Sequence, residues 1–303
     1  MSVKLLCVYH CQAPLLRNEI VYPIHAGRAL LTQQVQNGRL TPQEAQWLKD
    51  QLPGDDSGDN ISTLNPHINE MTAIYWAWKN YDLLGNPDYL GVMHYRRQFW
   101  LKTDLQAPDF LSAIGCTEAD IMKALKGYQA ICLKLKGSRP LKDHLIEMQV
   151  DTVLLEEALR VASELYPQAA ADYRHIVNDE KIEPSRNMFI LPREEFFRYC
   201  EWIFGVLLPL QVRTERFYKG RNIGYIAEVF TTIYLRSMQK AGKKIREVDM
   251  IYAQDMFPTG WKRKLKAWRR WLAVRIVGPW HKKYNRYVRF EKIRQMRKYF
   301  KNY

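Results

Sequence analysis

The sequence has no apolar stretch approaching the roughly 20 residues that a membrane-spanning helix needs. Its first apolar run, Leu5 to Tyr9, is also too short for the core of a signal peptide. We therefore expect no spanning helix, and any contact with a membrane should be made at its surface. Cysteine is scarce and odd in number, since the chain has only five. This count favours reduced thiols in the cytoplasm over a disulfide framework.

Several motifs of well-known enzymes are also missing. The sequence has no G-x-S-x-G, no Walker loop and no G-x-G-x-x-G. Cys7, His10 and Cys11 are spaced like metal ligands, but no second half of a metal site lies nearby. Buried thiols at the end of a strand explain this cluster better than a metal centre.

Acidic residues are nearly absent from one end of the chain. Residues 262–303 contain sixteen Lys or Arg and a single acid, Glu291, and this segment accounts for the formal net charge of +14. Five apolar residues recur at helical spacing just here: Trp261, Leu265, Trp268, Leu272 and Ile276. We therefore divide the chain into a domain at 1–255 and a basic amphipathic helical tail at 256–303.

The basic tail has three interpretations. Trp and Tyr favour the headgroup level of a bilayer and a cationic face favours anionic lipid, which predicts association with an anionic membrane surface. The apolar stripe could instead pack on the preceding domain. Binding of nucleic acid through phosphates and stacked bases is the third interpretation. Because the aromatic residues fall at helical spacing, we expect a membrane partner and no nucleic acid.

Strand-like and helix-like segments alternate along residues 1–255, which predicts an α/β sheet flanked by helices. We expect strands at 3–9, 88–93, 128–133 and 187–191. We expect helices at 40–51, 65–80, 117–126, 150–178 with a break at Pro167, from Pro192 onward, and 223–240.

His94, Tyr95, Arg96 and Arg97 follow directly after the strand expected at 88–93. In open α/β sheets, ligands bind outside the carboxyl ends of strands. Arginine supplies a rigid fork of donors that matches phosphate oxygens. The position is compatible with a diphosphate site, although this segment by itself favours a surface arginine pair beside acidic residues.

Asp55, Asp56, Asp59 and Asn60 lie in a turn-rich loop at 53–60. These side chains could contact a nucleotide ribose or base, or share a divalent ion such as manganese or magnesium. The loop lacks a carboxylate at the twelfth position, so it is not an EF-hand. The spacing alone favours the alternative, a polar turn without a ligand.

Glu228 is the best candidate for a general base. It follows Arg221 by seven residues, which places both on one helix face and roughly 10 Å apart. Glu228 lies beside the apolar face, where partial burial would raise its pKa and suit it to accept a proton. The alternative is a solvated helical carboxylate.

Five segments together resemble the capsular and exopolysaccharide biosynthesis proteins grouped as domain of unknown function 4422. They are GDNIS (58–62), NEMTAIYWAWKN (69–80), DYLGVMHYRRQF (88–99), NMFILPREEFFRYCEWIF (187–204) and RNIGYIAE (221–228). The resemblance spans about residues 3–250. It implies a Rossmann-like mixed sheet of the GT-A type and a glycosyltransferase activity. The basic tail lies outside it.

The resemblance also implies substrates and site residues. We expect transfer of a hexosyl group, galactosyl or galactofuranosyl, from a UDP-sugar to a lipid-linked or growing surface polysaccharide at the cytoplasmic face of the cell membrane. No Asp-x-Asp follows the strand at 88–93, so arginines would replace the usual metal at the diphosphate. The expected donor-side residues are His10, Asp59, Asn60, His94, Tyr95, Arg96 and Arg97. The expected acceptor-side residues are Asn187, Met188, Arg221 and Tyr225, with Glu228 or Asp59 as the base. A non-catalytic assembly scaffold is an alternative, because a fold does not prove activity.

Overall fold

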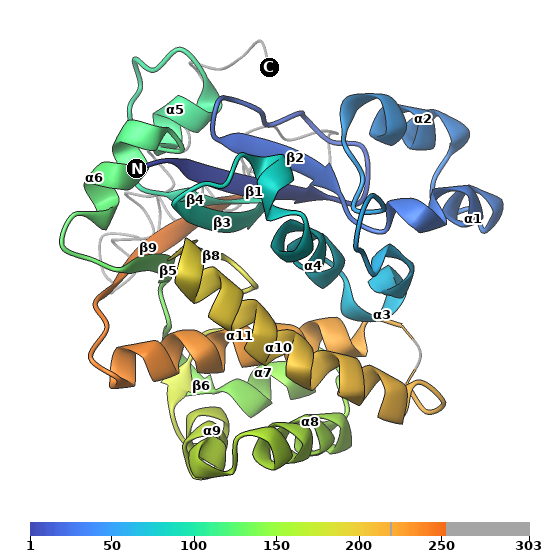
Figure 1. Ribbon diagram of the computed structural model, residues 1–303, viewed down its shortest axis with the longest axis vertical. Coiled ribbons are helices and arrows are strands. Elements are labelled where there is room, and N and C mark those ends of the chain that lie inside the picture. Colours follow the sequence, from blue (N-terminus) through green and yellow to red (C-terminus); the bar gives the residue numbers. More distant parts are fainter. Residues whose placement is uncertain (219, 253–303) are drawn as a thin grey trace, which may run out of the picture.

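A seven-stranded mixed sheet with helices on both faces forms the centre of the structure (Figure 1). The structure is a computed structural model that describes residues 1–218 and 220–252. The tail expected at 256–303, with its helical stripe, lies outside the described residues. The strand order is β2–β1–β3–β4–β9–β5–β8, and β3 also pairs with β8. The strands are β1 (Val3–Tyr9), β2 (Val21–His25), β3 (Tyr89–His94), β4 (Arg97–Trp100), β5 (Ala130–Leu133), β8 (Phe189–Pro192) and β9 (Ile245–Tyr252), and β6 (Lys136–Pro140) and β7 (Lys181–Ile182) form a separate pair.

The central strand β1 determines where polar side chains gather. It is a continuous apolar run, buried on both sheet faces, as is typical of a strand with parallel neighbours. It pairs in parallel with β2 on one side and β3 on the other, and Val8 lies opposite His94. The carboxyl ends of β1 and β3 therefore lie side by side, and the residues that follow each strand share one edge of the sheet.

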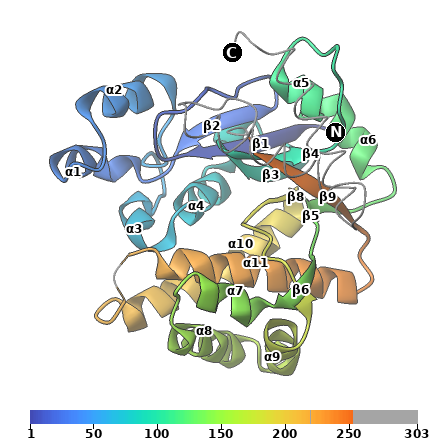
Figure 2. The same cartoon turned by 180° about the vertical axis from the view of Figure 1, so that it is seen from behind.

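Two apolar cores cover the two faces of the sheet. The larger core contains residues of α4, α8, α10 and α11, and the smaller one contains residues of α2, α5 and α6. Figure 2 shows both helical layers from behind. The helices are α1 (Leu31–Gln36), α2 (Pro42–Gln51), α3 (Asn65–Ile68), α4 (Met71–Lys79), α5 (Phe110–Ile114), α6 (Glu118–Leu125), α7 (Leu141–Glu147), α8 (Thr152–Leu165), α9 (Ala170–Asn178), α10 (Arg193–Thr214) and α11 (Asn222–Lys240).

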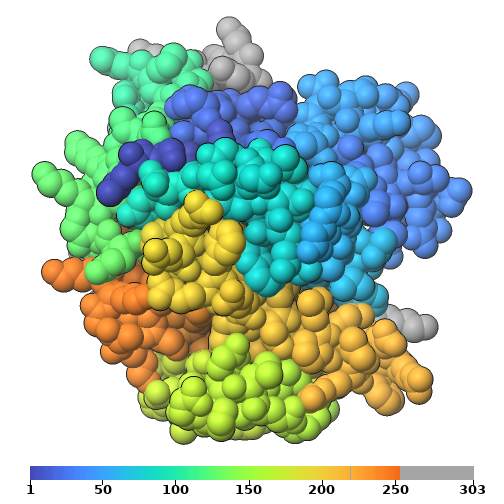
Figure 3. All heavy atoms as spheres, in the orientation of Figure 1, coloured from blue at the N-terminus to red at the C-terminus, as the bar shows by residue number. Residues whose placement is uncertain are grey.

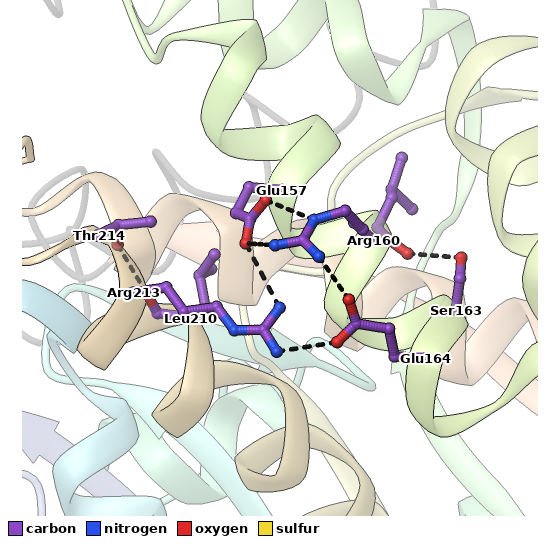
Figure 4. A network of polar contacts seen from close by, with 8 residues as sticks. Glu157, Arg160, Ser163, Glu164, Leu210, Arg213 and Thr214 are labelled. Carbon is purple, nitrogen blue, oxygen red and sulfur yellow. Dashed lines mark hydrogen bonds and ion pairs between the residues drawn. The ribbon is translucent and has the colours of Figure 1, made fainter.

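Helix α10 joins the sheet region to the lower helices. Its surface lies between residues near 80 (teal) and helices α8 and α9 (yellow-green) in Figure 3. At its carboxyl end, Arg213 forms ion pairs with Glu157 and Glu164 of α8, and Arg160 pairs with the same two glutamates (Figure 4). Such exposed pairs contribute little to stability one by one, but together they join the end of α10 to α8.

Most expected elements are confirmed, and two are wrong in a way that matters for the site. Helix α2 begins at a Thr41 capping box, and the helical region at 150–178 is interrupted at Pro167, as expected. The helix expected at 65–80 is not continuous, because Asn69 adopts a left-handed conformation with φ of 54°. The strand expected from Asn187 begins only at Phe189, because Asn187 is also left-handed, with φ of 55°.

The part of the chain that the structure describes contains no helix long and apolar enough to span a bilayer.

Candidate functional site

A cavity of about 710 Å³ opens where β1 and β3 end. Its volume is in the range of pockets that bind small molecules and cofactors. Its wall includes the ends of β1 and β3, α1 and the loop after it, α3 and the break before α4, Met148, the turn before β8 and the start of α11. The polar and charged side chains in the wall are His10, Cys11, Gln34, Arg39, Asn65, Asn69, Glu70, His94, Tyr95, Arg96, Arg97, Arg186, Arg221, Tyr225 and Glu228.

The pairing of β1 with β3 places the HYRR segment in this wall. The amide of Tyr95 donates to the carbonyl of Val8 at 3.1 Å, so the chain leaves both strands together. The side-chain amide of Gln98 donates to the carbonyls of His94 and Tyr95, at 2.7 and 3.0 Å. The ring of Tyr95 stacks on Tyr9 of β1, with the two centroids 5.4 Å apart. This turn is therefore held rigidly, as a binding loop requires.

Positive charge dominates the cavity. Arg39, Arg96, Arg97, Arg186 and Arg221 face two glutamates in the wall. None of these five arginines forms an ion pair with another residue of 1–218 or 220–252. Such a cluster repels itself unless an anion neutralises it, so the cavity favours a ligand with several negative charges.

Arg97 shows how strongly these charges act on one another. Burial, together with the neighbouring charges of Arg96 and Arg186, lowers the pKa of Arg97. Its Nε is buried and has no hydrogen-bond partner among the described residues. An arginine keeps its proton in any protein environment, so this unpaired cation is available to a phosphate oxygen.

His94 supports the cavity wall as a neutral ring. Its Nε2 lies 2.8 Å from the carbonyl oxygen of Arg186. Burial and the charges of Arg97 and Arg96 lower the pKa of His94, against the opposing influence of Glu70 and of that carbonyl. The neutral imidazole therefore donates from Nε2 and holds the backbone of Arg186 in place.

Glu228 is the buried carboxylate of the cavity. Its residue is 7% exposed, and its Oε2 has no hydrogen-bond partner among the described residues. Burial, together with the charge of Glu70, raises the pKa of Glu228 to about 7, although Arg186, Arg97 and Arg221 oppose the shift. A carboxylate that exchanges its proton near neutral pH and keeps one oxygen free is well suited to general-base chemistry.

Glu70 is a second cavity carboxylate that sequence reasoning did not identify. It stands at the break that Asn69 introduces between α3 and α4. Asn187 donates through Nδ2 to Oε1 of Glu70 at 2.9 Å. Burial acts to raise the pKa of Glu70, but the hydrogen bond from Asn187 and the charge of Arg221 act in the opposite direction, and the pKa lies below its usual value. Of the two cavity carboxylates, Glu70 therefore keeps its negative charge to lower pH than Glu228 does.

Arg186 was also missed by the sequence analysis. It adopts a left-handed conformation with φ of 58° immediately before left-handed Asn187. This uncommon pair of residues turns the chain so that the Arg186 side chain joins the cavity wall. After glycine, asparagine is the residue that best tolerates such a conformation. Asn69 and Asn187 were therefore the residues in the sequence that could have indicated the two turns.

The remaining expected site residues lie elsewhere. Asp55 is fully buried and accepts hydrogen bonds from the amides of Gly27 and Arg28 and from the hydroxyl of Ser62. The cavity wall does not include Asp55, Asp56, Asp59, Asn60, Asn187 or Met188. Asp59 accepts from the Tyr75 hydroxyl at 3.3 Å, Met188 belongs to the smaller core, and Asn187 stands behind Glu70.

Within residues 1–218 and 220–252, no group of three or more His, Cys, Asp or Glu side chains is arranged to hold a metal ion.

Comparison with known proteins gives one family and one similar solved structure. A family model described as domain of unknown function (DUF4422) matches residues 4–240. No curated protein matches the chain. Among solved structures, the apo form of the bifunctional glycosyltransferase WbbM is similar, with 27% sequence identity and a TM-score of 0.66. The match covers 83% of this chain and 45% of that one, so this chain spans less than half of the longer protein.

Proposed function

This chain belongs to the family described as domain of unknown function (DUF4422), and we propose that it is a GT-A-like glycosyltransferase that uses a nucleotide-sugar donor. One observation carries the proposal above all. Five arginines that form no ion pair within residues 1–218 and 220–252 line a cavity at the carboxyl ends of β1 and β3, and a buried carboxylate lies in the same wall. Ligands of open α/β sheets bind at this edge.

In this proposal the arginines bind the diphosphate of the donor. Arg96 and Arg97 follow β3, and Arg186 and Arg221 reach the same cavity from the turn before β8 and the start of α11. As the bond from the anomeric carbon to the diphosphate breaks, its electron pair passes to the departing oxygen. Cations fixed beforehand around that oxygen stabilise the charge that develops there.

Glu228 activates the acceptor. Its carboxylate, in the cavity wall, accepts the proton of an acceptor hydroxyl while the hydroxyl oxygen forms a bond to the anomeric carbon. The transition state resembles an oxocarbenium ion, as in other glycosyl chemistry. Arg221 and Tyr225, on the same helix, line the cavity beside Glu228 and contact the acceptor side.

We further propose a UDP-linked hexose, galactosyl or galactofuranosyl, as the donor and a lipid-linked or growing surface polysaccharide as the acceptor. The family resemblance and the similarity to the WbbM glycosyltransferase support these assignments. A lipid-linked acceptor cannot leave the bilayer, so the enzyme would work as a peripheral protein at the cytoplasmic face of the cell membrane. The basic residues of 262–303 would contact anionic lipid there.

A donor screen tests this function. The full chain is mixed with a panel of nucleotide-sugars, melting temperatures are recorded, and the donors that stabilise it are tested for slow hydrolysis. We expect at least one UDP-hexose to raise the melting temperature and to be hydrolysed. Arg186→Ala should reduce the stabilisation, whereas Arg174→Ala, which removes an exposed arginine paired with Glu156, should not. A chain that no nucleotide-sugar stabilises, and that hydrolyses none, contradicts the proposal.

A further inference from the structure

A buried chain of hydrogen bonds ties Glu70 to the helix that carries Glu228. Asn187 donates to Glu70 and accepts, through Oδ1, from the hydroxyl of Thr231 at 2.6 Å. Thr231 is itself fixed by the hydroxyl of Tyr199 at 2.7 Å, deep in the larger core. Glu70 is therefore held by side chains that are almost completely buried, and it cannot turn away from the cavity without leaving Asn187 unpaired.

The same helix places Glu228 close to this anchor. Thr231 and Glu228 are three residues apart on α11, so they lie on one face of the helix. Both carboxylates line the one cavity. The hydrogen bonds that run from Tyr199 to Glu70 therefore fix the charge of Glu70. This charge lies beside the face of α11 that carries Glu228.

We propose that Glu70 is a positioning residue, because Asn187 and Thr231 fix its negative charge in the cavity that Glu228 shares, where it makes Glu228 the stronger base. The inference rests on the proposed function, in which Glu228 is the base. Without a neighbouring charge, a carboxylate among three arginines would give up its proton readily and would be too weak a base to take one from a hydroxyl.

Other groups around Glu228 act in the opposite direction. Titratable and charged groups from several segments face the cavity with it. They are His10 and Cys11 after β1, Arg39 after α1, Glu70 between α3 and α4, His94, Tyr95, Arg96 and Arg97 at the end of β3, Arg186 before β8, and Arg221 and Tyr225 at the start of α11. Arg186, Arg97 and Arg221 lower the pKa of Glu228, whereas burial and Glu70 raise it. His94 is neutral, for the reasons given above. Among these side chains, Glu70 is thus the one whose charge favours the protonated form.

The direction of the expected change follows from these signs. Glu228 acts as a base only after it has lost its proton, so turnover should rise as pH passes upward through its pKa. Glu70→Gln keeps the acceptor for Asn187 and removes the charge, so the pKa of Glu228 should fall. We expect the midpoint of the rise to move to lower pH by about one unit, the size of a single nearby charge.

NMR of the carboxyl carbons measures the pKa of Glu228 directly, without any need for turnover. The full chain is labelled with 13C at the glutamate carboxyls, and the Glu228 signal is identified as the one missing from Glu228→Gln. Its titration midpoint is then compared between the unmodified chain, Glu70→Gln and Glu194→Gln, in which the carboxylate removed is fully exposed on α10. Asn187→Ala, which releases Glu70 from its anchor, provides a second variant, and circular dichroism verifies that each variant is folded.

A lower midpoint in Glu70→Gln, with Glu194→Gln unchanged, supports the inference. An unchanged midpoint in folded Glu70→Gln and Asn187→Ala overturns it. The pH profile of donor hydrolysis separates this result from the proposed function. If the midpoint moves but no nucleotide-sugar is ever consumed, the proposed function fails and the coupling of the two carboxylates stands.

Discussion

Arg221 donates through Nε to Oδ1 of Asn69 at 2.8 Å, across a sequence separation of 152 residues. This bond joins the start of α11 to the turn from which Glu70 enters the cavity. Gly224, one helical turn further along α11, lies against the same asparagine. A Cβ at Gly224 would be 1.8 Å from the Asn69 Nδ2, so only glycine allows the helix to approach the turn this closely.

Gly224→Ala should therefore disturb the site as well as the fold. The added methyl group displaces Asn69 and releases the Arg221 guanidinium. We expect a loss of about 1–3 kcal/mol in the free energy of unfolding, the usual cost of overpacking, together with weaker UDP binding. Urea denaturation and calorimetry measure the two effects. Gly205→Ala in α10 is the matched control, because its nearest neighbour lies 3.8 Å away, and it should be neutral or slightly stabilising.

Glu228→Gln keeps the shape of the side chain and removes its basicity. If Glu228 takes the proton of the acceptor hydroxyl, turnover should fall by about 100-fold or more while donor binding stays intact. Transfer assays at saturating donor, with calorimetric titration of UDP, provide both values. Turnover close to that of the unmodified enzyme would return Glu228 to a structural role.

Transfer activity should survive EDTA, because in our account arginines provide the positive charge at the diphosphate. Activity is compared before and after chelation, and again after manganese or magnesium is added. An absolute requirement for either ion would contradict this account and would direct attention back to Asp56 and Asp59. Asp55 is a weaker candidate, since its carboxylate already accepts hydrogen bonds from two amides and a hydroxyl.

The segment from Trp261 onward should bind anionic membranes. Each Lys or Arg near such a surface contributes about 1 kcal/mol, so a third of the sixteen bases in 262–303 would suffice to localise the protein. The full chain and a version that ends at Gly260 are sedimented with anionic and with neutral vesicles. We expect only the full chain to sediment, and only with anionic vesicles at low salt. Equal binding by the two versions would refute the anchor.

The site residues at the ends of strands were predictable from sequence, whereas the site residues in turns were not. An apolar run followed by HYRR is a local pattern, so the position of these residues at the carboxyl end of β3 could be inferred. The strand itself includes His94, and Arg97 begins β4, which the sequence did not predict. The role of Glu70 depends on Asn187, which is 117 residues away and carries no local signal of that contact. Left-handed Asn69 and Arg186 likewise depend on tertiary packing, which overrides the helix and strand preferences of their neighbours.

The acidic loop illustrates the opposite situation. Three carboxylates within five positions suggested a ligand site, yet Asp55 satisfies backbone amides inside the protein and Asp59 contacts Tyr75 outside the cavity wall. Composition alone cannot distinguish a carboxylate that binds a ligand from one that caps its own loop, because both uses need the same acceptor oxygens.

Titration calorimetry of UDP against arginine variants tests the central claim most directly. Arg97→Ala and Arg96→Ala should each weaken UDP binding by about 1.5–3 kcal/mol, the scale of a charge-assisted hydrogen bond. Arg174→Ala, far from the cavity wall, should bind UDP like the unmodified chain. The three variants should bind uridine, which lacks the diphosphate, with equal affinity. Equal affinity for UDP in the unmodified chain, Arg96→Ala and Arg97→Ala would contradict the claim that these arginines hold the donor diphosphate.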